Sequence, residues 1–474
     1  MITPHNGNFG WVGIFRLGLI QTALGSIVVL TTSTLNRVMV VELALAAMLP
    51  GVLVGLHSAL QVSRPMWGHA SDGGRRRSPW IAGGMIILAG AGVLAAKATA
   101  IMSEQLELGI AVAVVAYLLI GVGVGAAGTN LLALLAARVD ADRKAPAAAM
   151  VWIMMIAGFI VTTATAGALL KPFSFDRLVE VTAWVSAAAL LVTFVALFRL
   201  EGRAMVQTHA SDAPRTPFVE ALKEVMKDRE AATFTVFVFV SMLAYNTQDL
   251  ILEPFAGAVF SLSPGDSTQL TSVQHSGVLF GMILVACLAG RMRWSALRPL
   301  ARLLEVFGLR STKRWAVVGC VASGLLLFAL AASGFMTEDP EVLRRLVGGL
   351  GFANGAFAVA AIGWMMGLAS KGGGGKEGIR MGLWGGAQAI AFALGGFVGT
   401  MGVDIFRYTQ NSPIVPYAAV FVVEGAMFLV AATLASRLGA TRSGLSASDL
   451  VAATLSPDEA SPGPLAGAAR ELSA

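Results

Sequence analysis

Charged residues are scarce in this chain. Asp, Glu, Lys and Arg make up 13% of its 474 residues, whereas they account for about a quarter of a typical soluble domain. Hydrophobic residues make up 56%, and the mean hydropathy is +0.74. This composition excludes a soluble globular domain and indicates a polytopic membrane protein. The net charge of +6 does not indicate nucleic-acid binding, because the basic residues are spread over many short segments.

Cysteine is also scarce, and catalytic motifs are lacking. Cys287 and Cys320 lie in different apolar runs, so they are expected to be small core residues rather than a disulfide or a redox pair. The stretch "SKGGGGKEG" at 370–378 lacks the spacing of a phosphate-binding loop, and is predicted to be a hinge. The sequence has no nucleotide motif, metal-ligand cluster or nucleophile arrangement. We therefore predict that the protein is not an enzyme and has no nucleotide cofactor.

Long apolar runs are what the chain has instead. A helix of about 20 apolar residues spans the ~30 Å hydrocarbon core of a bilayer. The runs are apolar all round rather than alternating, which excludes the strands of a membrane barrel. The predicted fold class is an all-α polytopic membrane protein with 12 transmembrane helices. The runs lie near residues 16–36, 41–62, 80–100, 108–137, 146–170, 180–200, 232–253, 270–290, 314–335, 343–369, 378–402 and 414–437.

The basic residues predict the orientation. Most of the 34 Lys and Arg residues fall on one side when the N-terminus is placed inside, and such residues concentrate in cytoplasmic loops. Both termini are therefore predicted to be cytoplasmic. The longest internal connection divides the chain into an N-terminal six-helix half at 1–200, a cytoplasmic linker with an amphipathic helix at 201–231, a C-terminal six-helix half at 232–438 and a disordered cytoplasmic tail at 439–474.

The stretch "GHASDGGRRRSPW" gathers charge between two apolar runs. Its Gly68, Asp72, Arg76 and Arg77 resemble the signature that the major facilitator superfamily carries between its second and third helices, and two six-helix halves are the plan of that superfamily. The resemblance implies a helix clamp or gate on the cytoplasmic side. Arg75 departs from the signature, which has a second Gly at that position. The positive-inside rule alone also accounts for arginines in such a loop.

Two longer segments carry a closer resemblance. The segment at 36–84, which includes "PGVLVGLHSALQVSRPMWGHASDGG", and the segment at 246–282, which begins "NTQDLILEPFAGAVF", resemble the PucC/LhaA family of photosynthetic bacteria, also called the bacteriochlorophyll delivery family. The resemblance implies a membrane assembly factor for light-harvesting antenna complexes that binds bacteriochlorophyll and delivers it to antenna polypeptides. It implies a bacterial inner or intracytoplasmic photosynthetic membrane as the location.

The same resemblance implies the partners. Antenna polypeptides, the reaction centre, bacteriochlorophyll and the lipid bilayer are the expected partners, and nucleic acid is not. The alternative interpretation of the sequence is a proton-coupled secondary transporter of a small solute or a tetrapyrrole.

Two histidines are candidate ligands for the pigment. The magnesium of bacteriochlorophyll takes an axial ligand, typically a histidine nitrogen or an oxygen donor. His57 and His275 lie well within apolar runs, where each is expected either to hydrogen-bond to a neighbouring helix or to bind this magnesium. The other histidines lie in polar segments. We predict no metal site other than this axial position.

The stretch "TQDLILEPF" places carboxylates inside the seventh run. Asp249 and Glu253 are four residues apart and are expected on one helical face, beside Gln248. Three roles stay open for the two carboxylates: relaying a proton, holding a polar edge of the pigment through hydrogen bonds, or pairing with a basic residue of another helix as a structural lock. Gln248 and Asp249 are candidate pigment-binding residues. Pro254 is expected to end the helix, which places Glu253 at the outer interface in a structural role.

Other polar residues and several glycines suggest contacts between helices. Asn130 and Glu424 lie deep in their runs and are expected to hold helices together. Glu42 follows Arg37 and is expected to open the second run at the outer boundary. Glycines recur at a spacing that allows close helix packing, at Gly121 and Gly125, Gly351 and Gly355, and Gly395 and Gly399.

Overall fold

The computed structural model describes residues 9–60, 76–140, 144–201, 229–289, 311–371, 377–409 and 412–438, and every regular element in them is helical. Elements η1 and η2 are π-helical turns, and η5 is a 3-10 turn. In chain order the elements are α1 (Trp11–Val29), η1 (Leu30–Thr34), α2 (Leu35–Arg37), η2 (Val38–Glu42), α3 (Met48–Leu60), α5 (Ser78–Ile101), α6 (Leu106–Arg138), α7 (Lys144–Leu169), α8 (Phe175–Leu197), α10 (Arg229–Thr247), η5 (Gln248–Leu250), α11 (Leu252–Phe260), α12 (Pro264–Ala289), α14 (Thr312–Met336), α15 (Pro340–Lys371), α16 (Glu377–Thr409) and α17 (Val415–Arg437).

Described helices occupy all the predicted spans. Ten helices within the described residues are long and apolar enough to cross a membrane. An eleventh span consists of a bent pair, Arg229–Leu250 and Leu252–Phe260, and α3 is a shorter apolar helix at the second predicted position. The prediction of an all-α polytopic membrane protein is therefore confirmed. Most of the linker at 201–231, and the whole tail at 439–474, lie outside the described residues.

The first span is longer than the sequence analysis predicted. It continues through both π-helical turns to Glu42, so Glu42 ends the first span and the prediction that it opens the second is wrong. Arg37, which follows the first predicted run at 16–36, lies inside this helix and is 2% exposed. Hydropathy did not reveal this extension, because a polar side chain that is paired inside the protein looks the same in sequence as one in a loop.

The seventh span is broken rather than ended. The helix α10 stops at Thr247, the 3-10 turn η5 follows, and α11 continues after a bend of 43°. Pro254 lies in the first turn of α11, so the prediction that it ends the helix is wrong. Proline is tolerated there because the first N–H groups of a helix have no intrahelical partner to lose. Asp249 and Glu253 consequently belong to two differently directed elements.

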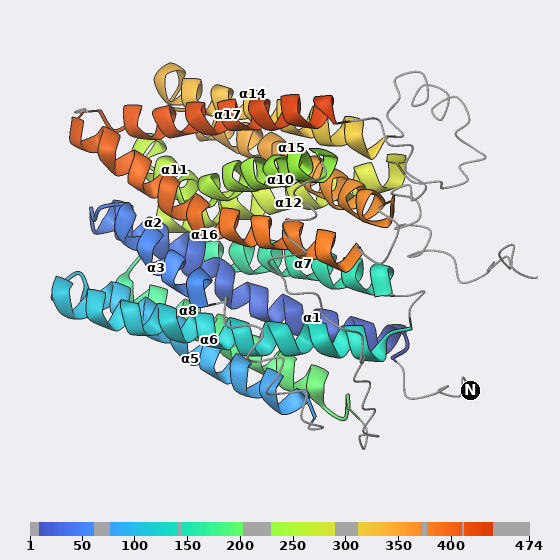
Figure 1. The fold of residues 1–474 in the computed structure, drawn as a ribbon. Coiled ribbons are helices and arrows are strands. Elements are labelled where there is room, and N and C mark those ends of the chain that lie inside the picture. Colours follow the sequence, from blue (N-terminus) through green and yellow to red (C-terminus); the bar gives the residue numbers. More distant parts are fainter. Residues whose placement is uncertain are drawn as a thin grey trace, which may run out of the picture.

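Each half of the bundle has its own hydrophobic core. One cluster of buried side chains runs from Ile14 to Leu200, and the other runs from Ala231 to Leu438 and includes Val40 and Ala47 from the N-terminal half. Figure 1 shows α1 to α8 packed below α10 to α17, with the helix axes roughly parallel. We call the left-hand end in Figure 1, opposite the N-terminus, the far end; it carries η2, α11 and the connection between α3 and η2.

The predicted close packing is confirmed for Gly121, Gly351, Gly355, Gly395 and Gly399. A Cβ at Gly351 or Gly355 would lie 2.1 Å from a backbone oxygen of α12, so α12 and α15 touch backbone to backbone. A Cβ at Gly399 would lie 2.5 Å from the side chain of Thr247. Cys287 and Cys320 are both free, as expected. Close backbone approach of this kind is a common way for helices to associate in a membrane.

Candidate functional site

A set of hydrogen-bonded polar side chains around Glu253, which we call the Glu253 belt, joins the two halves next to the break in the seventh span. Ser33 in the first span and Thr271 in α12 both donate hydrogen bonds to Oε1 of Glu253 in α11. The hydroxyls of Ser33 and Thr271 lie 3.2 Å apart. Glu253 was predicted to lie at the outer interface, but it is 2% exposed and sits between the halves. A buried carboxyl needs such donors, because leaving it without them costs free energy.

Further contacts extend this belt along the first span. The hydroxyls of Thr34 and Thr268 lie 3.0 Å apart, and Asn36 Nδ2 donates to the Leu250 carbonyl at 2.6 Å. The bond to Leu250 is made at the break, where the change from α10 through η5 to α11 frees backbone carbonyls. The π-helical turn at Leu30–Thr34 lies at this contact, and π-turns within helices are frequent at functional sites.

Arg37 is the buried cation of the belt. Its guanidinium pairs with Glu42 and donates to the Leu262 carbonyl at 2.5 Å. Gly257 of α11 packs against the guanidinium, since a Cβ there would lie 2.8 Å from Nη2. The charge of Arg37 also acts on the Glu253 carboxyl. The structural lock, one of three roles left open for Glu253, therefore has a cation from another helix nearby.

Two carboxylates, Asp266 and Asp404, make contacts between the halves at the far end. Lys171 after α7 pairs with Asp266 in the first turn of α12 at 2.5 Å. Asp404 in α16 accepts hydrogen bonds from the backbone N–H groups of Ala47 and Met48, at 2.9 and 2.6 Å, at the start of α3. A carboxylate is stabilised at a helix N-terminus because the N–H groups there have no intrahelical partner. Neither contact could be predicted from the sequence, because each joins residues far apart in the chain.

Gln248 and Asp249 lie side by side in the chain but in different surroundings. Gln248 is 0% exposed, and neither polar atom of its amide has a hydrogen-bond partner among the described residues. Asp249 is exposed, and the stacked pair of Tyr245 and Phe392 lies one helical turn before it, with ring centroids 6.4 Å apart. The structure therefore places an accessible carboxylate and an aromatic surface together at the break.

The two candidate histidines differ in access. His57 in α3 is 6% exposed. His275 in α12 is partly buried, its Nδ1 lies 2.9 Å from the Thr271 carbonyl, and its ring meets Phe159 edge-on at 5.0 Å. A carbonyl only accepts, so Nδ1 of His275 carries the proton and donates, and Nε2 has a free lone pair. His275 is thus linked through Thr271 to the Glu253 belt.

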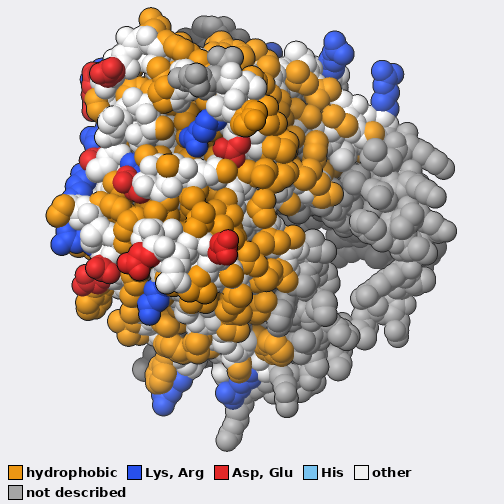
Figure 2. Space-filling model, turned by 90° about the vertical axis from the view of Figure 1, so that its left-hand side faces the viewer, with side chains coloured by type: hydrophobic (Ala, Val, Ile, Leu, Met, Phe, Trp, Pro, Cys, Tyr) orange, Lys and Arg blue, Asp and Glu red, His pale blue; other side chains and the backbone are white. Residues whose placement is uncertain are grey.

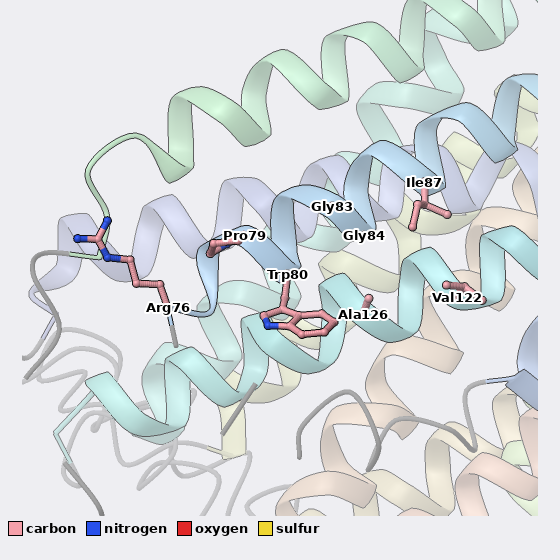
Figure 3. A pocket seen from close by; sticks show the side chains of 8 residues that line it. All are labelled: Arg76, Pro79, Trp80, Gly83, Gly84, Ile87, Val122 and Ala126. Atoms are coloured by element: carbon pink, nitrogen blue, oxygen red, sulfur yellow. The ribbon is translucent and has the colours of Figure 1, made fainter. Parts of the chain in front are cut away.

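The loop predicted to act as a clamp is only partly described. Gly68, Asp72 and Arg75 lie outside the described residues. Arg76 is exposed and lies at one end of a groove of about 620 Å³ between α5 and α6, whose other lining residues are Pro79, Trp80, Gly83, Gly84, Ile87, Val122 and Ala126. Figure 3 shows Trp80 pointing from α5 towards α6, and the Arg76 guanidinium turned away from the other lining residues.

Glu201 fixes the start of α5. Its carboxylate accepts the backbone N–H groups of Arg77 and Ser78, at 3.2 and 2.6 Å. The end of the sixth span is thereby tied to the beginning of the third. Glu201 is a functional candidate that was not predicted, and its one signal in the sequence is an acidic side chain next to basic residues.

The fold defines the class of protein. The solved structure of the nucleoside transporter NupG matches with a TM-score of 0.65 at 17% identity, covering 90% of this chain and 98% of that chain. A D-xylose-proton symporter matches with a TM-score of 0.64 at 15% identity, covering 91% and 99%. This chain is therefore a multi-pass membrane protein with the fold of the major facilitator superfamily. At these identities the likeness shows the fold alone.

The sequence comparisons show the family. The profile of the PUCC protein family matches residues 34–443, and the chain belongs to this family. A Rhodobacter capsulatus protein named bacteriochlorophyll synthase 44.5 kDa chain is 43% identical over 433 residues, covering 91% of this chain and 96% of that relative. Protein PucC of Cereibacter sphaeroides is 29% identical over 437 residues, covering 88% and 90%. The resemblance to the PucC/LhaA family is therefore confirmed.

Proposed function

We propose that this protein is a non-enzymatic membrane assembly factor for light-harvesting antenna complexes, and that it binds bacteriochlorophyll and delivers it to antenna polypeptides. Membership of the PUCC family is the observation that carries the proposal. The relative that is 43% identical bears a name that refers to bacteriochlorophyll. The proposed location is the bacterial inner or intracytoplasmic photosynthetic membrane, with both termini cytoplasmic and with antenna polypeptides and the reaction centre as partners.

His275 is the residue that best fits the pigment. A ligating histidine usually donates its other ring N–H to a carbonyl or carboxylate, which leaves one nitrogen free for the metal. Nδ1 of His275 makes this contact with the Thr271 carbonyl. Phe159 supports the imidazole ring from α7. Bacteriochlorophyll would supply a magnesium with an open axial position, and His275 Nε2 would occupy it.

His57 fits the pigment less well, and Gln248 and Asp249 would act at its edge. The His57 side chain is 6% exposed, so a macrocycle would reach it only after α3 moved. Asp249 is accessible, and the adjacent Gln248 amide has unused donor and acceptor atoms. The Gln248 amide would donate a hydrogen bond to a carbonyl group at the pigment rim once its side chain turned outwards, and Asp249 would do so when its carboxyl is protonated.

The test is an absorption spectrum of the protein purified gently from pigmented membranes. We expect bacteriochlorophyll and antenna polypeptides to copurify with the wild-type protein, and His275→Leu to lose most of the pigment. His209→Leu is the matched control, because His209 lies in a polar segment outside the spans. Absence of both pigment and antenna polypeptides from the wild-type preparation would overturn the proposed function. Unchanged pigment in His275→Leu would overturn only the ligand assignment.

Proton-coupled transport is the second candidate, and the accessible carboxylate of Asp249 within a membrane span favours it. Liposomes that contain the purified protein would then take up a small solute or a tetrapyrrole when a proton gradient is applied, and Asp249→Asn would abolish this uptake. Uptake of this kind, together with a lack of bound pigment, would replace the assembly function with transport.

A further inference from the structure

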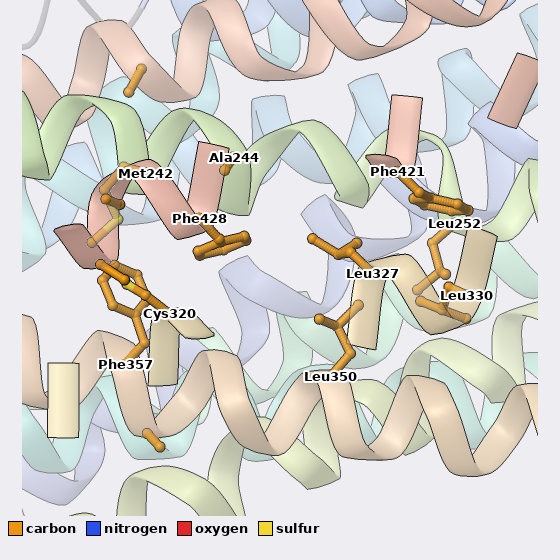
Figure 4. Close-up of a cluster of buried hydrophobic side chains, with 14 of the residues drawn as sticks. Met242, Ala244, Leu252, Cys320, Leu327, Leu330, Leu350, Phe357, Phe421 and Phe428 are labelled. Atoms are coloured by element: carbon orange, nitrogen blue, oxygen red, sulfur yellow. The ribbon is translucent and has the colours of Figure 1, made fainter. Parts of the chain in front are cut away.

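Glu424 is a buried carboxyl that the proposed function does not use. It lies in α17, is 1% exposed, and neither of its oxygens has a hydrogen-bond partner among the described residues. Phe421 and Phe428 lie about one turn away on either side of it on the same helix. Their rings contact Phe255 at 5.0 Å and Phe357 at 6.0 Å. Figure 4 shows Phe421 and Phe428 among the apolar side chains of this core.

These surroundings determine the charge state of Glu424. An ionised carboxylate without a partner is very costly in an apolar medium, and the usual response is that the group keeps its proton. Glu253 makes the contrast clear, because it is equally buried but accepts two hydrogen bonds and lies near Arg37. Glu424 has no such donors among the described residues, so it is expected to be neutral. At 1% exposure it also has no room for a pigment or another organic ligand.

Asp249 is the acidic neighbour of Glu424. It lies in η5, at the break in the seventh span, and its charge acts on Glu424 across the contact between α10 and α17. Unlike Glu424, Asp249 is exposed. Two like charges repel strongly where the surroundings are poor in water. A neutral Glu424 removes this repulsion and therefore allows Asp249 to ionise.

The other titratable groups on the packed helices include one neighbour of Asp249, and the rest are buried or make contacts elsewhere. On α10, Tyr245 lies close enough to Asp249 for the two groups to interact electrostatically. On α14, Cys320 is buried and Lys313 donates to the Leu438 carbonyl at the end of α17. On α16, Arg407 contacts Tyr417 at 3.2 Å, and Asp404 binds the start of α3. No described basic side chain is recorded in contact with Glu424 or Asp249.

We propose that Glu424 and Asp249 form a proton-binding pair in the C-terminal half, in which Glu424 stays neutral and Asp249 takes up and releases a proton. The pair is distinct from the Glu253 belt, which joins the two halves. It does not depend on bacteriochlorophyll binding, so it can be tested on protein without pigment.

Infrared spectroscopy of the purified protein tests the pair, because a protonated carboxyl has its own C=O stretching band. At mildly alkaline pH we expect a protonated-carboxyl band that Glu424→Gln removes and Asp249→Asn leaves. A step to mildly acidic pH should add a second band that Asp249→Asn removes. Glu253→Gln identifies any band from the other buried carboxyl, and Glu341→Gln is the exposed control.

Two results would overturn the proposal. One is an alkaline band that persists in Glu424→Gln, and the other is an acid-induced band that persists in Asp249→Asn. Glu424→Met gives an independent measurement if the glutamine variant folds poorly. A neutral, unpartnered Glu424 predicts that the methionine variant melts at the same or a higher temperature, whereas a fall in melting temperature would indicate an ionised Glu424 with a partner.

Discussion

At the scale of single residues, burial separates the charged groups that hold the fold together from those that do not. Arg37 is 2% exposed, with its guanidinium held by Glu42 and the Leu262 carbonyl. Arg345 pairs with Glu341 one turn earlier on α15, but its side chain is 78% exposed. Removing one partner of a buried pair leaves an uncompensated charge or acceptor, whereas an exposed pair exchanges its contacts with water.

This difference predicts unequal effects of two matched substitutions. Arg37→Met should lower the free energy of unfolding by about 3 kcal/mol, because Glu42 and the Leu262 carbonyl lose their donor. Arg345→Met should lower it by at most about 0.5 kcal/mol. Unfolding titrations in detergent measure both values. Equal losses of unfolding free energy in the two variants would show that the buried contacts of Arg37 do not stabilise the protein.

At the scale of the elements, small residues decide how closely the helices pack. The backbone of Gly355 in α15 touches the Val278 carbonyl of α12, where a Cβ would lie only 2.1 Å from the oxygen. Gly90 in α5 also lies in an apolar span, yet a Cβ there would meet nothing within 4 Å. Gly355 has a glycine four positions before it, whereas Gly90 has Ile86 and Leu94 four positions away, and the structure shows that only Gly355 makes a close backbone contact.

Alanine at these two positions tests the distinction. Gly355→Ala should destabilise the protein by about 1–3 kcal/mol, because α12 and α15 must move apart. Gly90→Ala should leave stability unchanged or raise it by up to about 1 kcal/mol, since alanine is the better helix former. Thermal unfolding of the two variants in the same detergent gives the comparison. A Gly355→Ala variant as stable as Gly90→Ala would contradict the close packing of α12 and α15.

At the scale of the whole molecule, the hydrogen bonds between the halves gather towards the far end. Among the described residues they are the Glu253 belt, the Arg37 bond to Leu262, the Lys171 contacts with α12 and the Asp404 contact with α3. Figure 2, viewed from the far end, shows charged side chains interspersed with hydrophobic ones rather than gathered in one patch. The halves are thus held together at this end by specific pairs.

A cross-link across the far end tests this arrangement. In a chain with Cys287→Ser and Cys320→Ser, the pair Lys171→Cys and Asp266→Cys should be joined by a short, reducible thiol-reactive cross-linker, because the longer native side chains are in contact. A protease site inserted in the linker makes the result visible. After cleavage the cross-linked halves stay together under denaturing conditions until the cross-link is reduced. The single-cysteine variants should separate. Complete separation of the double variant would mean that the far end is open in the membrane.

Much of the fold could be predicted from the sequence, whereas the site could be predicted only in part. Hydropathy located every span, since burial in hydrocarbon requires long apolar runs wherever a helix crosses. The break at Asp249 was not predicted, because Pro254 was expected to mark the end of the helix. Pro254 lies instead within the first turn of α11, where proline is compatible with a helix. Ser33 was missed as well. A hydroxyl within an apolar run gives no sign of its partner, and Glu253 lies 220 residues away in the chain.

The sequence by itself determined that this protein spans a membrane many times, that its helices fill the predicted positions, and that it belongs to the PUCC family. These properties follow from local composition and from residues read in order. Only the tertiary structure decided that Glu253 meets Ser33 and Thr271 between the halves, and that Glu424 is buried without a partner. The physical reason is that the state of a buried polar group depends on which atoms face it, and that is set by how the two halves pack.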